Sequence, residues 1–101
     1  MTFDYHRPLL PQGKMGRFVA RDKETATRYG RIVLAAEMSN AQYSERHQHL
    51  AEANNMRPPP SHHRIFSGYV VVRRIGHSDR YETWMPEHVF AEIYVQEAAA
   101  Q

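Results

Sequence analysis

Histidine is unusually frequent in this chain among the residues that could do chemistry. There are seven histidines and no cysteine. His47 and His49 are two residues apart, so on a helix they would point in nearly opposite directions. His62 and His63 follow a proline run, and His77 falls in a predicted turn. A zinc or nickel site built from histidine alone needs three of them to converge. We therefore expect exposed polar histidines, no metal and no cofactor.

Acidic residues are the other candidates for catalysis. The candidate carboxylates are Asp79, Glu82, Glu87 and Glu92, all in the last quarter of the chain. Glu87 and Glu92 are five residues apart and would not share a helix face. No pattern places a nucleophile beside a base, as acyl or phosphoryl transfer requires. The sequence therefore indicates a protein that is not an enzyme.

Arginine and aromatic residues alternate between positions 57 and 84. Basic residues beside aromatic rings on a sheet bind single-stranded nucleic acid by phosphate contact and stacking. The structural interpretation, which we favour, places Trp84 in the core and pairs the arginines. Trp84 exposed beside Arg73 and Arg80 would reverse that preference. The candidate binding residues are Arg57, Arg64, Arg73, Arg74, His77 and Arg80.

Length and charge limit the kind of protein. With 101 residues and a net charge of +2, the chain is expected to form one domain over residues 1–101. Basic blocks (1–31 and 57–80) alternate with acidic ones (32–56 and 81–101), which indicates complementary packed elements or a basic face for an acidic partner. The longest apolar run is too short to cross a membrane, and no signal peptide is evident. We expect a soluble cytoplasmic protein.

Breaker residues dominate the start of the chain. Residues 1–16 contain prolines and glycines and are expected to form an extended arm, with Phe3 and Tyr5 suited to a short edge strand. A short strand is expected over residues 17–20.

Two helices are predicted in the middle of the chain. Asp22 is a suitable N-cap for a helix over residues 23–38, although the sequence RIVLA within it also fits a buried strand. Ser39 has the capping-box spacing for a second helix over residues 40–53, which should be largely solvated. Three consecutive prolines then predict a stiff linker over residues 57–64.

The last third of the chain predicts a β-hairpin. A strand over Ile65–Ile75 is followed by the turn sequence Gly-His-Ser-Asp and a second strand. The expected register places Arg73 opposite Glu82 and Val71 opposite Trp84. Arg74 would then lie opposite Tyr81, in cation–π contact.

A short helix is expected to follow the hairpin. Pro86 ends the second strand and can occupy the first helical position. The apolar residues Val89, Phe90, Ile93 and Tyr94 would form one stripe that packs on the sheet. Residues 98–101 are expected to fray.

The same region resembles the C-terminal end of small uncharacterised bacteriophage and prophage proteins. The resemblance rests on the segment Gly68–Val72 together with Trp84, Pro86, Phe90 and Tyr94, and on a Tyr-His-Arg-Pro start at residues 5–8. It covers about a third of the chain, and it departs in the spacing from Pro86 to Phe90 and in the helical middle. The resemblance implies a phage or prophage origin and no known activity.

The patterns together predict an α+β fold. A C-terminal antiparallel hairpin is extended by the N-terminal arm, with two central helices and a short C-terminal helix. The predicted function is a non-enzymatic interaction module that binds another protein, with nucleic acid as the alternative partner. No membrane association is expected, and homodimerisation through a free sheet edge is left open.

Overall fold

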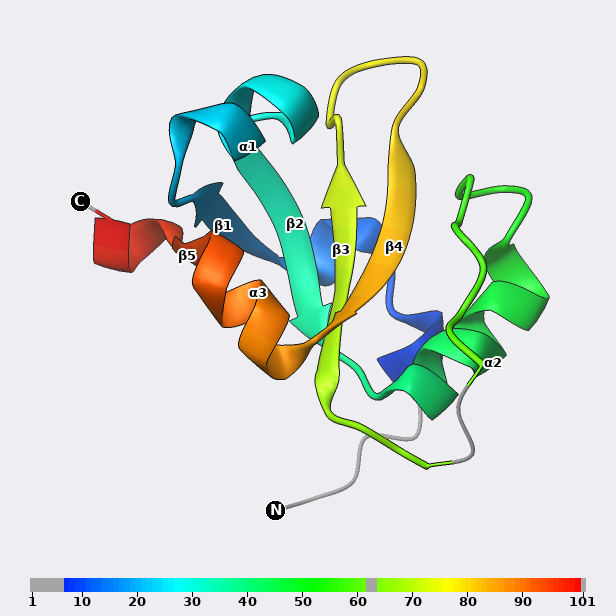
Figure 1. The fold of residues 1–101 in the computed structure, drawn as a ribbon. Helices are drawn as coiled ribbons and strands as arrows, with labels where there is room; N and C mark the ends of the chain where they lie inside the picture. The colour runs from blue at the N-terminus through cyan, green and yellow to red at the C-terminus, as the bar shows by residue number, and fades with distance from the viewer. Residues whose placement is uncertain (1–6, 62–63, 101) are drawn as a thin grey trace.

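The computed structural model describes residues 7–61 and 64–100 of the chain. Five strands form one antiparallel sheet in the order β4-β3-β2-β1-β5, with helices on both faces (Figure 1). The strands are β1 (Gly16–Ala20), β2 (Ile32–Glu37), β3 (Gly68–Arg73), β4 (Tyr81–Pro86) and β5 (Tyr94–Gln96). The predicted α+β class is confirmed.

The helices are short and lie between the strands. They are α1 (Lys23–Tyr29), α2 (Asn40–Leu50) and α3 (Glu87–Ile93), with 3-10 turns η1 (Arg7–Leu9), η2 (Gln12–Lys14) and η3 (Glu97–Ala100). The last of these occupies most of the tail that was expected to fray, while Gln101 lies outside the described residues. No helix in the described chain is long and apolar enough to span a bilayer.

The predicted helix over residues 23–38 is wrong in its second half. The N-cap is confirmed, because Asp22 Oδ1 accepts a hydrogen bond from the Thr25 amide at 2.7 Å. The helix ends before Gly30, whose φ of 100° no helix accommodates. The chain then returns to the sheet as β2, a central strand between β1 and β3. The apolar run that also fitted a buried strand is that strand.

Helix α2 begins as expected. Ser39 Oγ accepts a hydrogen bond from the Gln42 amide and Gln42 Oε1 accepts one from the Ser39 amide, which confirms the capping box. The helix ends at Leu50 rather than near residue 53. It is also less solvated than predicted, because the side chains of Tyr43 and Arg46 are completely buried.

The hairpin forms, but the predicted register is wrong by one residue. Val72 lies opposite Glu82, and Arg73 lies opposite Tyr81. The first strand begins at Gly68 rather than Ile65, and Arg74 already belongs to the loop, with φ at 57°. Because side chains alternate between faces, the shift places Glu82 on the face opposite Arg73. On that face Glu82 meets Arg46 of α2 at 2.8 Å, a partner 36 positions away.

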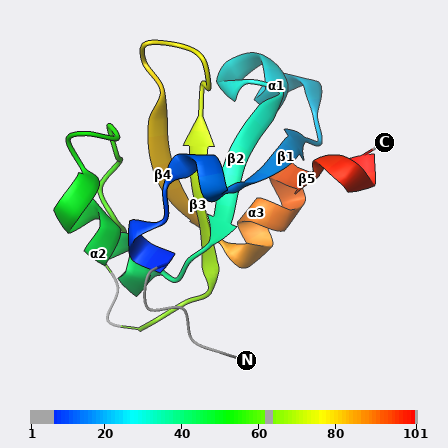
Figure 2. The same ribbon diagram turned by 180° about the vertical axis from the view of Figure 1, so that it is seen from behind.

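The described part of the N-terminal arm, residues 7–16, does not extend the hairpin. The strand beside β3 is β2, and the described part of the arm instead crosses one face of the sheet as η1 and η2 (Figure 2). The expected edge strand at Phe3 and Tyr5 lies outside the described residues. A fifth strand that was not predicted, β5, follows α3 and pairs with β1.

Side chains on the two faces of the sheet form two core layers. One layer lies under α2 and the arm, and the other lies under α3, as was expected for the final helix. The first layer consists of Met15, Met38, Tyr43, Met56, Val70 and Val72, and the second of Val33, Ala35, Val71, Met85, Phe90 and Tyr94. The sheet is therefore buried on both faces at β3, whose three consecutive valines are fully buried, as the run of apolar residues predicted.

Candidate binding surfaces

The structure brings together only two of the six predicted binding residues. Arg74 and His77, both in the β3–β4 loop, line one groove. Arg80 is exposed in the same loop but lies outside that lining. Arg57 is exposed beside β4, where its amide donates to the Glu82 carbonyl. Arg64 is exposed near the start of α2, where its carbonyl accepts from the Asn40 side chain. Arg73 lies on the face of the sheet covered by α3.

Arg73 is held among tyrosines rather than presented to solvent. Its guanidinium carbon lies 3.9 Å from the ring centre of Tyr29, and its Nε donates a hydrogen bond to the hydroxyl of Tyr94 at 3.1 Å. The cation–π contact expected between Arg74 and Tyr81 is instead made by Arg57, at 4.1 Å. These contacts hold Arg73, at the end of β3, against Tyr29 and Tyr94, and hold Tyr81, at the start of β4, against Arg57.

Of the four aromatic residues between the arginines, Tyr69, Tyr81 and Trp84 pack in or against the core, whereas Phe66 is exposed. Trp84 lies opposite Val70, on the face away from Arg73, and its indole N–H donates to the Met38 carbonyl at 2.6 Å. Tyr69 stacks on Phe90 with ring centres 4.0 Å apart. The arrangement that would have favoured a nucleic-acid interface, Trp84 exposed beside Arg73 and Arg80, is therefore not found.

The groove that contains Arg74 and His77 is basic, and we call it the basic groove. Its volume is about 610 Å³, and its walls come from β1, the end of α1, β2 and the β3–β4 loop. Sequence reasoning missed Arg17 and Arg31, because no local signal relates them to a loop more than forty residues away. The lining consists of Arg17, Ala26, Thr27, Gly30, Arg31, Ile32, Leu34, Arg74, Ile75 and His77.

Two of the arginines in the basic groove also pair with carboxylates outside its lining. Arg17 binds Glu97 through two contacts, at 2.6 and 3.4 Å, and Arg74 Nε lies 2.7 Å from Asp79 Oδ2. The guanidinium beside each carboxyl holds the pKa of Glu97 and of Asp79 below its usual value. Both carboxylates therefore stay ionised near neutral pH.

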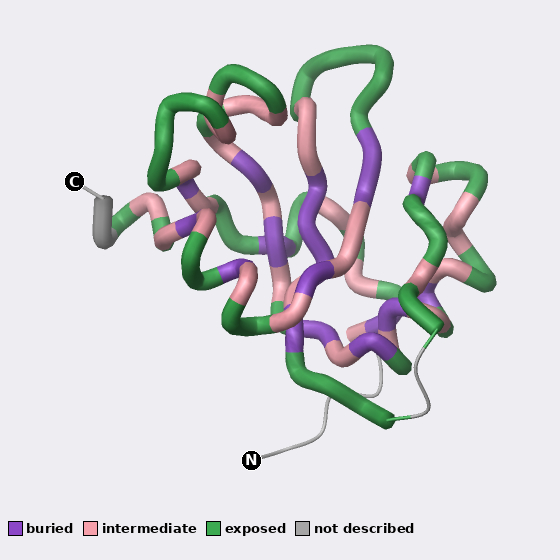
Figure 3. The backbone as a smooth tube through the Cα atoms, viewed as in Figure 1, coloured by how far each residue is buried: buried purple, intermediate pink, exposed green. Residues whose placement is uncertain are grey.

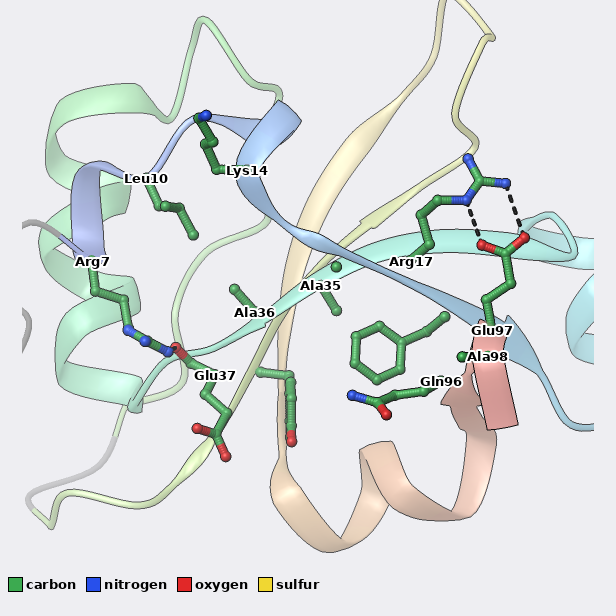
Figure 4. A pocket seen from close by; sticks show the side chains of 13 residues that line it. Arg7, Leu10, Lys14, Arg17, Ala35, Ala36, Glu37, Gln96, Glu97 and Ala98 are labelled. Carbon is green, nitrogen blue, oxygen red and sulfur yellow. Dashed lines mark hydrogen bonds and ion pairs between the residues drawn. The ribbon is translucent and has the colours of Figure 1, made fainter. Parts of the chain in front are cut away.

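A second, larger groove of about 800 Å³ lies on the other side of Arg17 (Figure 4). Arg17 and Glu97 pair at one end of it, while at the other end Arg7 Nη1 donates to the Glu37 carbonyl at 2.8 Å. Its lining mixes both signs of charge, with Lys14 as a third basic residue. One formal positive charge remains here too, but two carboxylates, Glu37 and Glu97, lie in the lining itself, whereas the lining of the basic groove has none.

An apolar groove of about 630 Å³ lies where β4 meets α3. We call it the Phe66 groove; its lining is Phe66, Ser67, Trp84, Pro86, Glu87, His88 and Ala91. Phe66 is 43% exposed and its neighbour Ile65 is 74% exposed, although both are large apolar side chains. Figure 3 shows this exposed stretch leading directly into the buried part of β3.

Asn40 fixes the backbone beside the Phe66 groove. Its buried side chain donates to the Arg64 carbonyl at 2.9 Å and accepts from the Phe66 amide at 2.8 Å. Its own amide donates to the Phe66 carbonyl at 3.2 Å, and the Glu87 amide donates to the Ser67 carbonyl at 3.1 Å. Four hydrogen bonds thus order a segment whose apolar side chains face solvent.

A buried ion pair joins the arm, α2 and β4. Arg46 and Glu82 are both 0% exposed, and Arg46 Nη1 also donates to the carbonyls of Pro8 and Leu10. Gln12 Nε2 donates to the second carboxylate oxygen of Glu82. With these polar atoms partnered, the ion pair and its hydrogen bonds hold the N-terminal arm against α2 and β4.

The described residues contain no group of three histidine or acidic side chains that could hold a metal ion. His62 and His63 lie outside the described residues. Comparison of the chain with protein-family models, curated proteins and solved structures gave no match.

Proposed function

We propose that the protein is a non-enzymatic interaction module that binds another protein through the Phe66 groove. The observation that carries this proposal is the ordered, exposed apolar segment at Ile65 and Phe66. Large apolar side chains in a fixed position beside a tryptophan have the composition of protein-binding hot spots. The resemblance to bacteriophage and prophage proteins supports a phage or prophage origin, and the lack of cysteine is compatible with a cytoplasmic location.

The hydrogen bonds of Asn40 give this surface a physical advantage in binding. A segment that is already ordered loses less conformational entropy when a partner docks. Side chains held this way would otherwise be expected to fold onto the core, because burying them stabilises the protein by about 1.5–3 kcal/mol each. The exposure of Ile65 and Phe66 is consistent with their burial by a bound partner protein.

Nucleic acid remains the second candidate, and it receives less support. Sequence-tolerant nucleic-acid binding combines a cationic track with aromatic stacking platforms. The lining of the basic groove has the cations but no aromatic residue. The Phe66 groove has aromatic side chains but no arginine or lysine. The two requirements are met on separate surfaces of the described chain.

Trp84 provides a direct test because it is the only tryptophan and lines the Phe66 groove. Peptides selected from a random displayed library on the wild-type protein are titrated while Trp84 emission is recorded. We expect apolar peptides that shift this emission, with affinity little changed between low and high salt. Phe66→Ala should weaken them by about tenfold or more, since a central aromatic contact contributes 2 kcal/mol or more.

Leu9 offers the matched control, because it is 53% exposed and lies on η1, outside the Phe66 groove. Leu9→Ala should leave peptide affinity unchanged. Equal binding to wild type and Phe66→Ala would refute the proposal. Sedimentation of the free protein shows separately whether the same surface pairs two copies of the chain, in which case Phe66→Ala would shift a dimer to monomer.

A further inference from the structure

We infer that the basic groove is a second binding site, and that it accepts an acidic, partly apolar peptide segment. This site is independent of the Phe66 groove and lies at the opposite end of the hairpin. The β3–β4 loop and α1 both lie at the end of the sheet where β2 begins (Figure 2). Residues of both segments line the basic groove.

The charge of the lining favours an anionic ligand. Three arginines and His77 contribute, and no aspartate or glutamate lies among the lining residues. Glu97 and Asp79 compensate two of the three arginines from outside the lining, so one formal positive charge remains with His77 neutral. Arg31 is exposed and belongs to neither of these ion pairs, and its charge also helps to hold the pKa of Glu97 below its usual value. We therefore assign the contact with a carboxylate of the ligand to Arg31.

The loop that carries Arg74 is built at an energetic cost. Arg74 has φ at 57°, in a region that non-glycine residues occupy at a cost of about 1–2 kcal/mol. The loop is docked onto the end of α1, since the Arg74 amide donates to the Tyr29 carbonyl at 3.0 Å. Glycine would adopt this conformation without strain. An arginine here therefore points to a role for its side chain, which lines the groove.

The floor of the groove decides between classes of ligand. Ile32 and Leu34 are half-buried there, and Ile75 is 38% exposed. Aliphatic side chains offer contact area to the apolar side chains of a peptide but no stacking platform to a base. A cationic wall over an aliphatic floor complements a segment that carries both carboxylates and aliphatic side chains.

The test uses a fluorescein-labelled peptide of about twelve residues that alternates glutamate with leucine, read by anisotropy at low and high salt. A lysine–leucine peptide of the same length and a single-stranded oligothymidine of similar length are titrated in parallel. We expect only the glutamate–leucine peptide to bind the groove, with affinity that falls as salt rises.

Arg31→Glu should weaken this binding by about tenfold or more, because it replaces an attraction by a repulsion. Lys23→Glu is the matched control: it changes the net charge equally from an exposed position at the start of α1, outside the lining, and should have less than about a twofold effect. Circular dichroism and thermal melts verify that both variants fold.

Three results would overturn the inference. These are equal losses for the two variants, tighter binding of the oligothymidine with the same dependence on Arg31, and no binding of the peptide at low salt. Phe66→Ala should leave this binding intact, so failure here is distinguishable from failure of the proposed function.

Discussion

The buried pair of Arg46 and Glu82 gives the sharpest prediction about stability. Glu82→Gln keeps the shape of the side chain but removes its charge. One carboxylate oxygen becomes an amide that donates, and it then faces donors on Arg46 or Gln12 instead of accepting from them. The guanidinium of Arg46, fully buried, would lose its counter-charge.

Breaking a buried pair by removing one partner costs about 3–5 kcal/mol, because an uncompensated charge stays in the interior. A protein of this size has a free energy of unfolding of about 5–15 kcal/mol, so the loss is a large fraction of the total. The expected fall in melting temperature is about 12–40 °C, at about 4–8 °C for each kcal/mol. Urea unfolding followed by circular dichroism measures the free energy directly.

The pair of Arg17 and Glu97 supplies the matched control. It has the same two residue types and a similar two-contact geometry, but both side chains are partly exposed. Solvent screens this pair, so Glu97→Gln should leave the melting temperature nearly unchanged. A Glu82→Gln protein as stable as Glu97→Gln would refute the reasoning, because it would show that complete burial adds nothing to the importance of the charge.

Three further predictions follow from packing and ionisation. Gly68→Ala should lower stability by about 1–3 kcal/mol in urea unfolding, since the added methyl would overlap the Trp84 ring. Asn40→Ala should weaken the peptides selected on the Phe66 groove by about a few fold in fluorescence titration, because the freed segment must be ordered on binding. Burial raises the pKa of Tyr43, so the folded protein keeps a proton that the unfolded chain releases above about pH 10. Stability should therefore fall as pH rises past that value, and phenolate absorbance should appear together with unfolding; a free energy of unfolding that stays constant to higher pH would contradict this.

Signals within a few residues of one another were sufficient to predict where the helices begin. Asp22 caps α1, and Ser39 and Gln42 form the capping box of α2, because each hydrogen bond closes within three residues. Pro86 ends β4 and precedes α3, although it serves as the N-cap rather than the first helical residue. The hairpin and its following helix were predicted for the same reason, since strand, turn and helix signals are contiguous there.

Contacts between distant residues decided the rest. RIVLA fits a helix or a strand by itself, and it becomes a strand because β1 and β3 flank it on both sides. The hairpin register follows from Arg46, whose buried guanidinium requires Glu82 on its own face of the sheet. Strand β5 exists only because β1 offers an edge to it.

The candidate sites divide in the same way. The sequence by itself identified Arg74 and His77 as candidate binding residues, but it placed only His77 in the turn and assigned Arg74 to the first strand. Only the tertiary structure placed Arg17 and Arg31 beside them, through the pairing of β1 with β2 and the docking of the loop on α1. Likewise, the sequence offered Phe66 only as one of several aromatic residues among arginines. The side chain of Asn40, 26 positions away, fixes its backbone at the surface. Local hydrogen bonds and turns can be read along the chain, whereas a groove forms from segments that meet only when the sheet assembles.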